Sequence, residues 1–428
     1  MSMTDALSFG LRRNDLPEYR RFAAGVGLRV MGVIASLASV VITSRGLGVE
    51  GRGLLYTCTS AASVAGVVLA LGMNSAVILV VAPRPELGRR AIRRALLAAS
   101  GAGLAALLMG LVFGFIAPEW LPPIVIELSP VVAGMVATQI FLWWCSSLTQ
   151  ALGAVDRLPL IEFLYRSGTV VWGWVALFYL KVSVVQFLAS LVALDALYGA
   201  LWMLYVRALT PPSRSVLPWP REWRHWSLKA YLPYALHTGM RRVDALILTS
   251  LAGTRTTGLY SIAIQTLDLC QIAPVFLGQK AMFAFSAGHG DSPSMRWLRR
   301  MLPLSTIATM ILAGLTADIW AGLFFGREFS TVGPIILALS IGGGALAWQT
   351  VAVQEINAMG FPIRLTFAWL ASFCTMIVLF FAVVPYYGAV GAAAGFSSSY
   401  VLLAVLIYQL RSRMRKIKMH RHPNEERT

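Results

Sequence analysis

Charged residues are scarce in this sequence. Only 13% of its 428 residues carry a charge, against about a quarter in a typical soluble domain. Acidic residues are the scarcest, with 19 Asp and Glu against 36 Lys and Arg. The shortage excludes a large water-soluble domain as the main body of the chain, because the surface of such a domain carries many charges.

Cysteine and histidine are also rare, and none is spaced as a metal or redox site requires. The four cysteines stand singly inside apolar runs, without a CxxC pair, at Cys58, Cys145, Cys270 and Cys374. Only His237 of the five histidines lies in an apolar run. Since paired-carboxylate spacing is missing too, the sequence predicts no catalytic centre, no metal site, no cofactor and no disulfide.

Long apolar runs are abundant. Hydrophobic residues make up 57% of the chain, and runs of about 20 residues, enough to cross a hydrocarbon core of about 30 Å, recur along it. The first twenty residues lack the apolar core of a signal peptide, so we expect the first run to remain as a helix. We predict an all-α polytopic membrane protein with about twelve transmembrane helices. The predicted spans are 22–43, 53–81, 95–117, 128–152, 159–180, 184–208, 230–252, 257–285, 301–324, 332–357, 364–384 and 388–410.

Basic residues indicate the orientation of these spans. With the N-terminus inside, 26 of the 36 Lys and Arg fall in inside segments and five within spans. The five in outside segments are Arg45, Arg52, Lys181, Arg255 and Arg327. Inside loops of polytopic proteins carry such an excess, so both termini are predicted to be cytoplasmic. The net charge of +17 is mostly this topology signal, with a secondary attraction to anionic phospholipids and no role in nucleic-acid binding.

The longest loop divides the spans into six and six. It is rich in proline, arginine and tryptophan, which suits a linker lying at the membrane surface, although a plain interhelical loop is the alternative. We predict two six-helix lobes around a central cavity. The segments are 1–21 (cytoplasmic N-terminal segment), 22–208 (N-terminal lobe), 209–229 (cytoplasmic linker), 230–410 (C-terminal lobe) and 411–428 (basic cytoplasmic tail).

A short internal repeat supports the two lobes. "LGVEGRGLLY" (47–56) follows the first span and "LAGTRTTGLY" (251–260) follows the seventh. Gly48 and Gly53 have the same spacing as Gly253 and Gly258, and Leu-Tyr comes next in both segments. Repeated bundles of this kind are common in transporters, which place the substrate site between the repeats.

The span at 230–252 contains charged residues near the middle of the bilayer. Arg241 lies about 16 Å along this helix, and it shares one face with Asp244 and His237. Arg242 points about 100° away. Asp268, in the next span, reaches a similar depth and is expected to neutralise Arg241 or Arg242. Charges at this depth are costly unless they have partners or line a hydrated cavity.

We therefore expect a hydrated, cationic cavity between the lobes. The guanidinium group forms paired hydrogen bonds with phosphate oxygens, so an excess of arginine favours an anionic headgroup over an organic cation. Candidate substrate-binding residues are Arg29, Arg166, Arg241, Arg242 and Gln265. Candidate ion-pairing or coupling residues are Asp195, Asp244, Asp268 and His237.

Structural interpretations of these residues remain open. Arg29, Lys280 and Glu355 lie close enough to the cytoplasmic interface for their charges to reach it. Glu162 and Arg166 have the spacing of a structural ion pair on one helix. The charges at 241–244 could instead lock the spans at 230–252 and 257–285 together, and His237 could be a packing residue.

Three segments resemble the polysaccharide-export (O-antigen-type) flippases. They are "SRGLGVEGRGLLY" (44–56), "LPYALHTGMRRVDALILTSLAGTRTTGLYSIAIQTLD" (232–268) and "VVPYYGAVGAAAGFSSSY" (383–400). The resemblance extends over nearly the whole chain. These flippases belong to the multidrug/oligosaccharidyl-lipid/polysaccharide superfamily, together with multidrug extruders and the lipid II flippase.

The resemblance implies transport and not catalysis. It implies movement of an undecaprenyl-diphosphate-linked oligosaccharide from the cytoplasmic to the periplasmic leaflet of a bacterial inner membrane, by alternating access of two lobes around a cationic lumen. Other polysaccharide-assembly proteins would be partners, and H⁺ or Na⁺ a coupling ion. The alternatives are a multidrug/cation antiporter, an integral-membrane glycosyltransferase or polymerase, and a scaffold of an assembly complex. The antiporter would need surplus acid in its cavity, and the enzyme would need a larger extramembrane loop.

Overall fold

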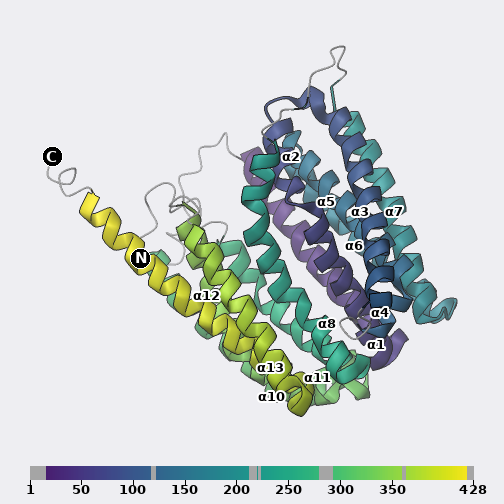
Figure 1. Cartoon of the computed structure of the whole chain (residues 1–428), viewed down its shortest axis with the longest axis vertical. Helices are drawn as coiled ribbons and strands as arrows, with labels where there is room; N and C mark the ends of the chain where they lie inside the picture. The colour runs from purple at the N-terminus through teal and green to yellow at the C-terminus, as the bar shows by residue number, and fades with distance from the viewer. Residues whose placement is uncertain are drawn as a thin grey trace.

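The computed structural model describes residues 16–116, 122–211, 219, 223–278, 293–358 and 363–421. This described part is built of helices and contains no strand (Figure 1). The main helices are α1 (Leu16–Ala70), α2 (Met73–Val81), α3 (Gly88–Ile116), α4 (Pro123–Glu127), α5 (Ser129–Ala151), α6 (Leu158–Trp174), α7 (Val184–Leu209), α8 (Trp223–Cys270), α10 (Pro293–Leu315), α11 (Ala317–Phe324), α12 (Gly333–Ala358) and α13 (Ile363–Arg421).

Three of these helices reverse direction at a glycine. α1, α8 and α13 have non-helical backbone at Gly48 (φ 66°), Gly253 (φ 80°) and Gly388 (φ 52°), a left-handed region that glycine enters without the clash of a Cβ atom. Hydrogen bonds cross two of the turns. Arg52 Nη1 donates to Thr43 Oγ1 at 2.8 Å, and the hydroxyls of Thr249 and Thr257 lie 2.9 Å apart.

Six helices of the described part are long and apolar enough to cross a membrane, or eight if each of two bent pairs is taken as one span. Since α1, α8 and α13 each reverse, the chain makes more passes than it has such helices. The total of twelve transmembrane helices stays a prediction. Several boundaries differ from those predicted. The second span breaks at Leu71 and Gly72, which both have positive φ, and the ninth breaks between α10 and α11. α3, α8 and α10 begin before the predicted spans, and α13 continues into the predicted tail as far as Arg421.

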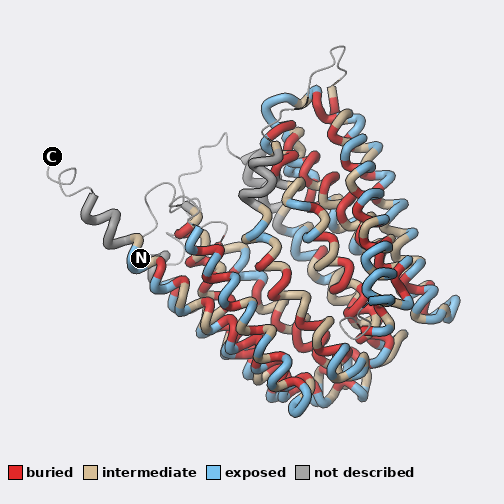
Figure 2. The backbone as a smooth tube through the Cα atoms, viewed as in Figure 1, coloured by how far each residue is buried: buried red, intermediate tan, exposed pale blue. Residues whose placement is uncertain are grey.

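The helices pack around two hydrophobic cores, one for each lobe. One core is formed by α1 to α7, and the other is formed mainly by α8 to α13 with three residues of α1. Large apolar side chains also face outward on both lobes, including Phe115, Ile116 and Tyr386, and exposed strips alternate with buried ones along the outer helices (Figure 2). An apolar exterior suits contact with lipid, and the chain is a multi-pass membrane protein.

The lobes meet where α1 and α8 turn. A Cβ atom on Gly53 would lie 1.8 Å from the Thr254 carbonyl oxygen, and one on Gly258 would lie 2.0 Å from that of Val49, so the two backbones touch reciprocally. The hydroxyls of Thr57 and Thr249 are 2.6 Å apart across the same contact. We call the contacts at Gly53, Gly258, Thr57 and Thr249 the outer seam, because the distribution of basic residues predicts that this end faces outside.

A second contact lies beside the outer seam. Arg45 of α1 donates from Nε to the carbonyl oxygen of Phe324 at 2.8 Å, and from Nη2 to that of Leu323. These carbonyls end α11, where a cation is favourable because the helix dipole leaves a partial negative charge. The turns of α1 and α8 lie close to α11 in Figure 1, whereas α2 and the C-terminal part of α12 lie apart from each other on the other side of the molecule.

Candidate functional site

A cavity of about 640 Å³ lies between the lobes, and we call it the interlobe cavity. Its N-lobe wall comes from α1 and α6, and its C-lobe wall comes from the two ends of the α8 hairpin and the segment after it. Arg29, Arg166 and Arg241 line it, together with Glu162 and Asp268. The three guanidinium groups exceed the two carboxylates by one positive charge.

The rest of this lining is mainly apolar. It includes Leu28, Val30, Val33, Pro159, Phe163, Leu269, Ile272, Val275 and Phe276. Fixed charge and extended apolar walls in one cavity suit a ligand with an ionic headgroup and a hydrocarbon portion, because burial of hydrocarbon stabilises the complex while the charges orient the headgroup.

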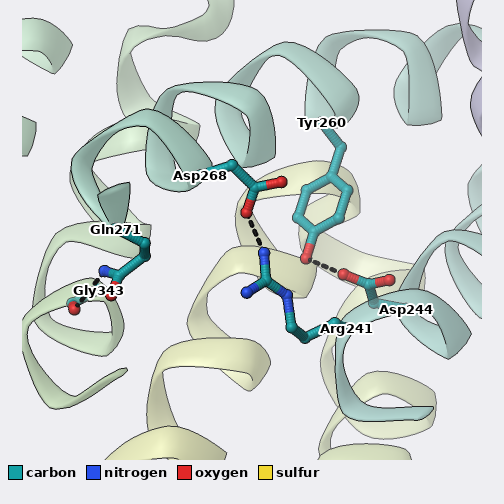
Figure 3. Close-up of polar contacts among 6 residues, drawn as sticks. All are labelled: Arg241, Asp244, Tyr260, Asp268, Gln271 and Gly343. Atoms are coloured by element: carbon teal, nitrogen blue, oxygen red, sulfur yellow. Dashed lines mark hydrogen bonds and ion pairs between the residues drawn. The ribbon is translucent and has the colours of Figure 1, made fainter. Parts of the chain in front are cut away.

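Arg241 and Asp268 form the ion pair expected between the two arms of α8 (Figure 3). Nη2 of Arg241 contacts Oδ1 of Asp268, so the prediction that Asp268 neutralises an arginine of the facing helix is confirmed. The Arg241 and Asp268 side chains are 24% and 25% exposed, respectively. The pair therefore holds α8 together and still presents charge to the interlobe cavity.

Asp244 lies beside this pair but has different partners. It is fully buried, and it accepts hydrogen bonds from Tyr260 Oη at 2.8 Å and from the backbone N–H of Ala245 at 2.7 Å. Figure 3 shows Asp244 directed to Tyr260, with Arg241 turned toward Asp268. Arg241 and Asp244, predicted to share one face of the helix, therefore have different surroundings: Arg241 lines the cavity, and Asp244 is buried in the packing of α8.

His237 and Arg242 line neither this cavity nor the N-lobe chamber described next. His237 stands edge-on to Trp369 of α13, with ring centroids 5.2 Å apart. The guanidinium carbon of Arg242 lies 5.9 Å from the centroid of the Tyr56 ring, a cation–π contact from one lobe to the other. Both positions are those of residues that join helices.

A second cavity, of about 570 Å³, lies within the N-terminal lobe, and we call it the N-lobe chamber. Asp195 lines it and accepts a hydrogen bond of 2.7 Å from Tyr165 Oη. Gln265 of α8 also lines it, and Glu162 and Arg166 line both cavities. Asp195 and Gln265 are thus placed apart from Arg29 and Arg241. Within the described residues no ion pair joins Glu162 and Arg166, and Arg166 donates to Ser36 Oγ.

Arg52 was missed as a site residue, because the sequence prediction left it in the loop before the second span. It lines the N-lobe chamber and is only 7% exposed. The sequence prediction began the second span at Gly53, whereas the helix restarts directly after Gly48, so Arg52 lies inside its first turns. The Gly-x-x-x-Arg spacing after a reversal would have been the signal for this burial.

Glu355 was also misjudged as able to reach the interface. It is 3% exposed and accepts from Arg299 Nη1 at 2.9 Å and from Arg411 Nε at 2.5 Å, which joins α10, α12 and α13. Lys280 lies outside the described residues. Across the described ranges, no group of three His, Cys, Asp or Glu side chains is placed to hold a metal ion.

Part of the linker packs on the N-terminal lobe. The guanidinium carbon of Arg94 lies 4.5 Å from the centroid of the Trp219 ring, and Trp219 and Trp223 border a small cavity beside α2, α3 and α5. Ten of the 21 residues of the predicted linker, 212–218 and 220–222, lie outside the described residues, and 223–229 form the start of α8.

Comparison with known proteins identifies solved structures that share this fold. No family model matches the chain. A probable flippase of Haloferax volcanii, AglR, is 24% identical over 190 residues, which cover 42% of this chain and only 40% of that protein. An inward-facing multidrug-resistance MATE transporter of the MOP superfamily has a TM-score of 0.70 at 14% identity, covering 94% of this chain and 99% of that one. The lipid II flippase MurJ, in an inward closed conformation, has a TM-score of 0.70 at 11% identity, covering 91% of this chain and 86% of that one. The chain therefore has the two-lobe fold of the MATE and MurJ transporters.

Proposed function

We propose that this protein is a flippase that moves a lipid-linked oligosaccharide, carried on a polyprenyl diphosphate, from the cytoplasmic to the outer leaflet. The observation that supports this most strongly is the lining of the interlobe cavity. Three arginines and an extended apolar wall share one space, as an amphiphile with an anionic headgroup requires. The similarity to the probable flippase AglR and the fold shared with the lipid II flippase MurJ support a flippase.

Arg241 is the proposed diphosphate ligand. Its guanidinium group already contacts one carboxylate oxygen of Asp268, and a diphosphate offers oxygens of the same geometry and more charge. Arg29 and Arg166 reach the cavity from the facing lobe, so a diphosphate bound to all three groups connects the lobes. No catalytic group is needed, because the cargo is moved without covalent change.

The transport cycle follows from the arrangement of the lobes. The outer seam closes one end, and Arg29 precedes Gly48 by 19 residues, which is about 28 Å of helix. The interlobe cavity is therefore remote from the seam, and this conformation accepts cargo from the cytoplasmic side. Opening of the seam and closure of the other end release the cargo outside, with H⁺, Na⁺ or the membrane potential as the driving force.

A cation antiporter is the second candidate, and one observation favours it. The N-lobe chamber contains Asp195 and Glu162 beside five aromatic side chains, a lining that can hold an organic cation. The charge of the interlobe cavity argues the other way. Export of a fluorescent cationic dye from vesicles, dependent on Asp195, would support the antiporter.

The test is a strain that lacks the protein. We expect lipid-linked sugar to accumulate in its cytoplasmic leaflet, and wild-type protein to clear it. Arg241→Ala, expressed at the same level, should not clear it. Arg364→Ala is the matched control, because Arg364 is an exposed arginine that lines neither cavity. Full clearance by Arg241→Ala would remove this residue from the proposed mechanism.

The remaining parts of the proposal concern location and partners. The bacterial inner membrane, with both termini in the cytoplasm, is the proposed location. Anionic phospholipids would contact the basic cytoplasmic segments, and other polysaccharide-assembly proteins would deliver and receive the cargo.

A further inference from the structure

Arg52 is a buried cation in the N-lobe chamber for which the described residues provide little compensation. Its side chain is 7% exposed and donates one hydrogen bond, from Nη1 to Thr43 Oγ1. Among the described residues its Nε–H is buried without an acceptor and no side chain forms an ion pair with it. A guanidinium group has five N–H donors, and burying it without an anion is costly.

The carboxylates of the N-lobe chamber belong to its other end. Arg166 contacts Ser36, and its neighbour Tyr165 donates to Asp195, so these groups cluster at the level of Ser36. Thr43, which marks the level of Arg52, follows Ser36 by seven residues, or about 10 Å of helix. The chamber thus has charges of both signs at one end and a lone positive charge at the end near the outer seam.

The wall at the end of the chamber that holds the carboxylates suits a sugar ring. Trp143, Trp202, Tyr165 and Tyr198 line the chamber together with the amide of Gln139. The ring centroids of Tyr165 and Tyr198 are 4.7 Å apart, and those of Tyr198 and Trp202 are 5.8 Å apart, so three rings form a continuous row. The Trp202 indole N–H is fixed by Thr149 Oγ1 at 2.9 Å. Such rings offer flat apolar faces to the C–H bonds of a sugar, while the amide and hydroxyl groups can bond its oxygens.

From this placement we infer that the N-lobe chamber binds the glycan of the cargo along its length, and that Arg52 pairs with the carboxylate or phosphate substituent of an acidic sugar in that glycan. The inference rests on the proposed flippase function, since it assigns the glycan and the diphosphate to different cavities. The diphosphate binds at Arg241 in the interlobe cavity. The shared lining residue Arg166 lies at the junction, so one cargo molecule can occupy both spaces. The protein is thereby a carrier of acidic glycans in preference to neutral ones.

The experiment measures equilibrium binding of four probes to the full chain in lipid nanodiscs. The probes are glucuronate, glucose, acetate and inorganic pyrophosphate. Wild-type protein should bind glucuronate at least tenfold more tightly than glucose or acetate. Arg52→Gln should remove this preference, Arg52→Lys should retain part of it, and both should bind pyrophosphate as the wild type does. Arg364→Gln is the matched control and should leave all four affinities unchanged.

Other outcomes would overturn the inference. Equal affinities of the wild type for glucuronate and glucose would show that the chamber does not recognise the carboxylate. This result comes from the wild-type protein alone, so it does not depend on whether a variant folds. Equal affinities for glucuronate and acetate would indicate an adventitious anion site. Loss of pyrophosphate binding in Arg52→Gln would assign the diphosphate to the chamber. The proposed function fails separately, if pyrophosphate binding is absent or is unchanged in Arg241→Gln.

Discussion

Replacement of Gly258 by alanine tests whether the outer seam holds the outer end closed. The added methyl group would lie 2.0 Å from the Val49 carbonyl oxygen and 2.9 Å from its carbonyl carbon, whereas ordinary contacts begin near 3.4 Å. The obstacle is backbone on both sides, so no rotamer change can relieve it. The lobes must separate by more than an ångström at this point, and the hydroxyl contact between Thr57 and Thr249 lengthens with them.

The expected shift is large. Overpacking at such a contact costs about 1–3 kcal/mol, and the lost hydrogen bond adds about 1 kcal/mol. The closed state is thus destabilised by about 2–4 kcal/mol relative to the open one. Because every 1.4 kcal/mol is a factor of about ten, the ratio of open to closed molecules should rise by roughly 30-fold to several hundredfold.

Electron–electron double resonance between the lobes measures this ratio. Spin labels at Lys181→Cys and Glu328→Cys, in a background without the four native cysteines, report the separation at the outer end, because both positions are exposed there. Gly258→Ala should move the distance distribution to longer values. The control is Gly101→Ala, since a methyl group at Gly101 meets no atom within 4 Å. A distribution that Gly258→Ala leaves unchanged would refute the reasoning that this seam holds the lobes together.

Two further substitutions test the polar groups between the arms of α8. Asp268→Asn leaves Arg241 facing the cavity without its carboxylate, so we expect a lower melting temperature in detergent as well as reduced transport, and preserved stability and transport would contradict the ion-pair role. Tyr260→Phe leaves the buried Asp244 without one hydrogen bond and should destabilise the protein by about 1–3 kcal/mol, seen as a shifted denaturation midpoint, while pyrophosphate affinity stays unchanged because neither residue lines the interlobe cavity.

Much of the architecture was predictable because membranes impose simple rules. An all-α protein of two lobes was predicted from the apolar runs, the partition of basic residues, and the short internal repeat at Gly48–Gly53 and Gly253–Gly258. This repeat proved more informative than expected. Its glycines mark both reversals and both faces of the lobe contact, since glycine adopts positive φ without strain and a Cβ atom would prevent the close backbone approach.

The site was less predictable, because depth along a helix does not tell which neighbour a side chain meets. Periodicity placed Arg241, Asp244 and His237 on one face, yet their partners are Asp268, Tyr260 and Trp369. Arg52 was misplaced for a related reason. A hydropathy boundary that was four residues late turned a buried cation into a loop residue.

The contact of Arg45 with the end of α11 has a consequence for genetics. Its acceptors are the main-chain carbonyl oxygens of Leu323 and Phe324. A residue of any type at these two positions supplies the same oxygen. Mutational scanning should therefore find that substitutions of Arg45 weaken this contact, whereas substitutions of Leu323 and Phe324 leave its hydrogen bonds in place. A second substitution on α11 that exchanges the charge cannot suppress the loss of Arg45, because no acidic side chain takes part in the contact. Suppressor substitutions should instead lie at the outer seam and strengthen its packing.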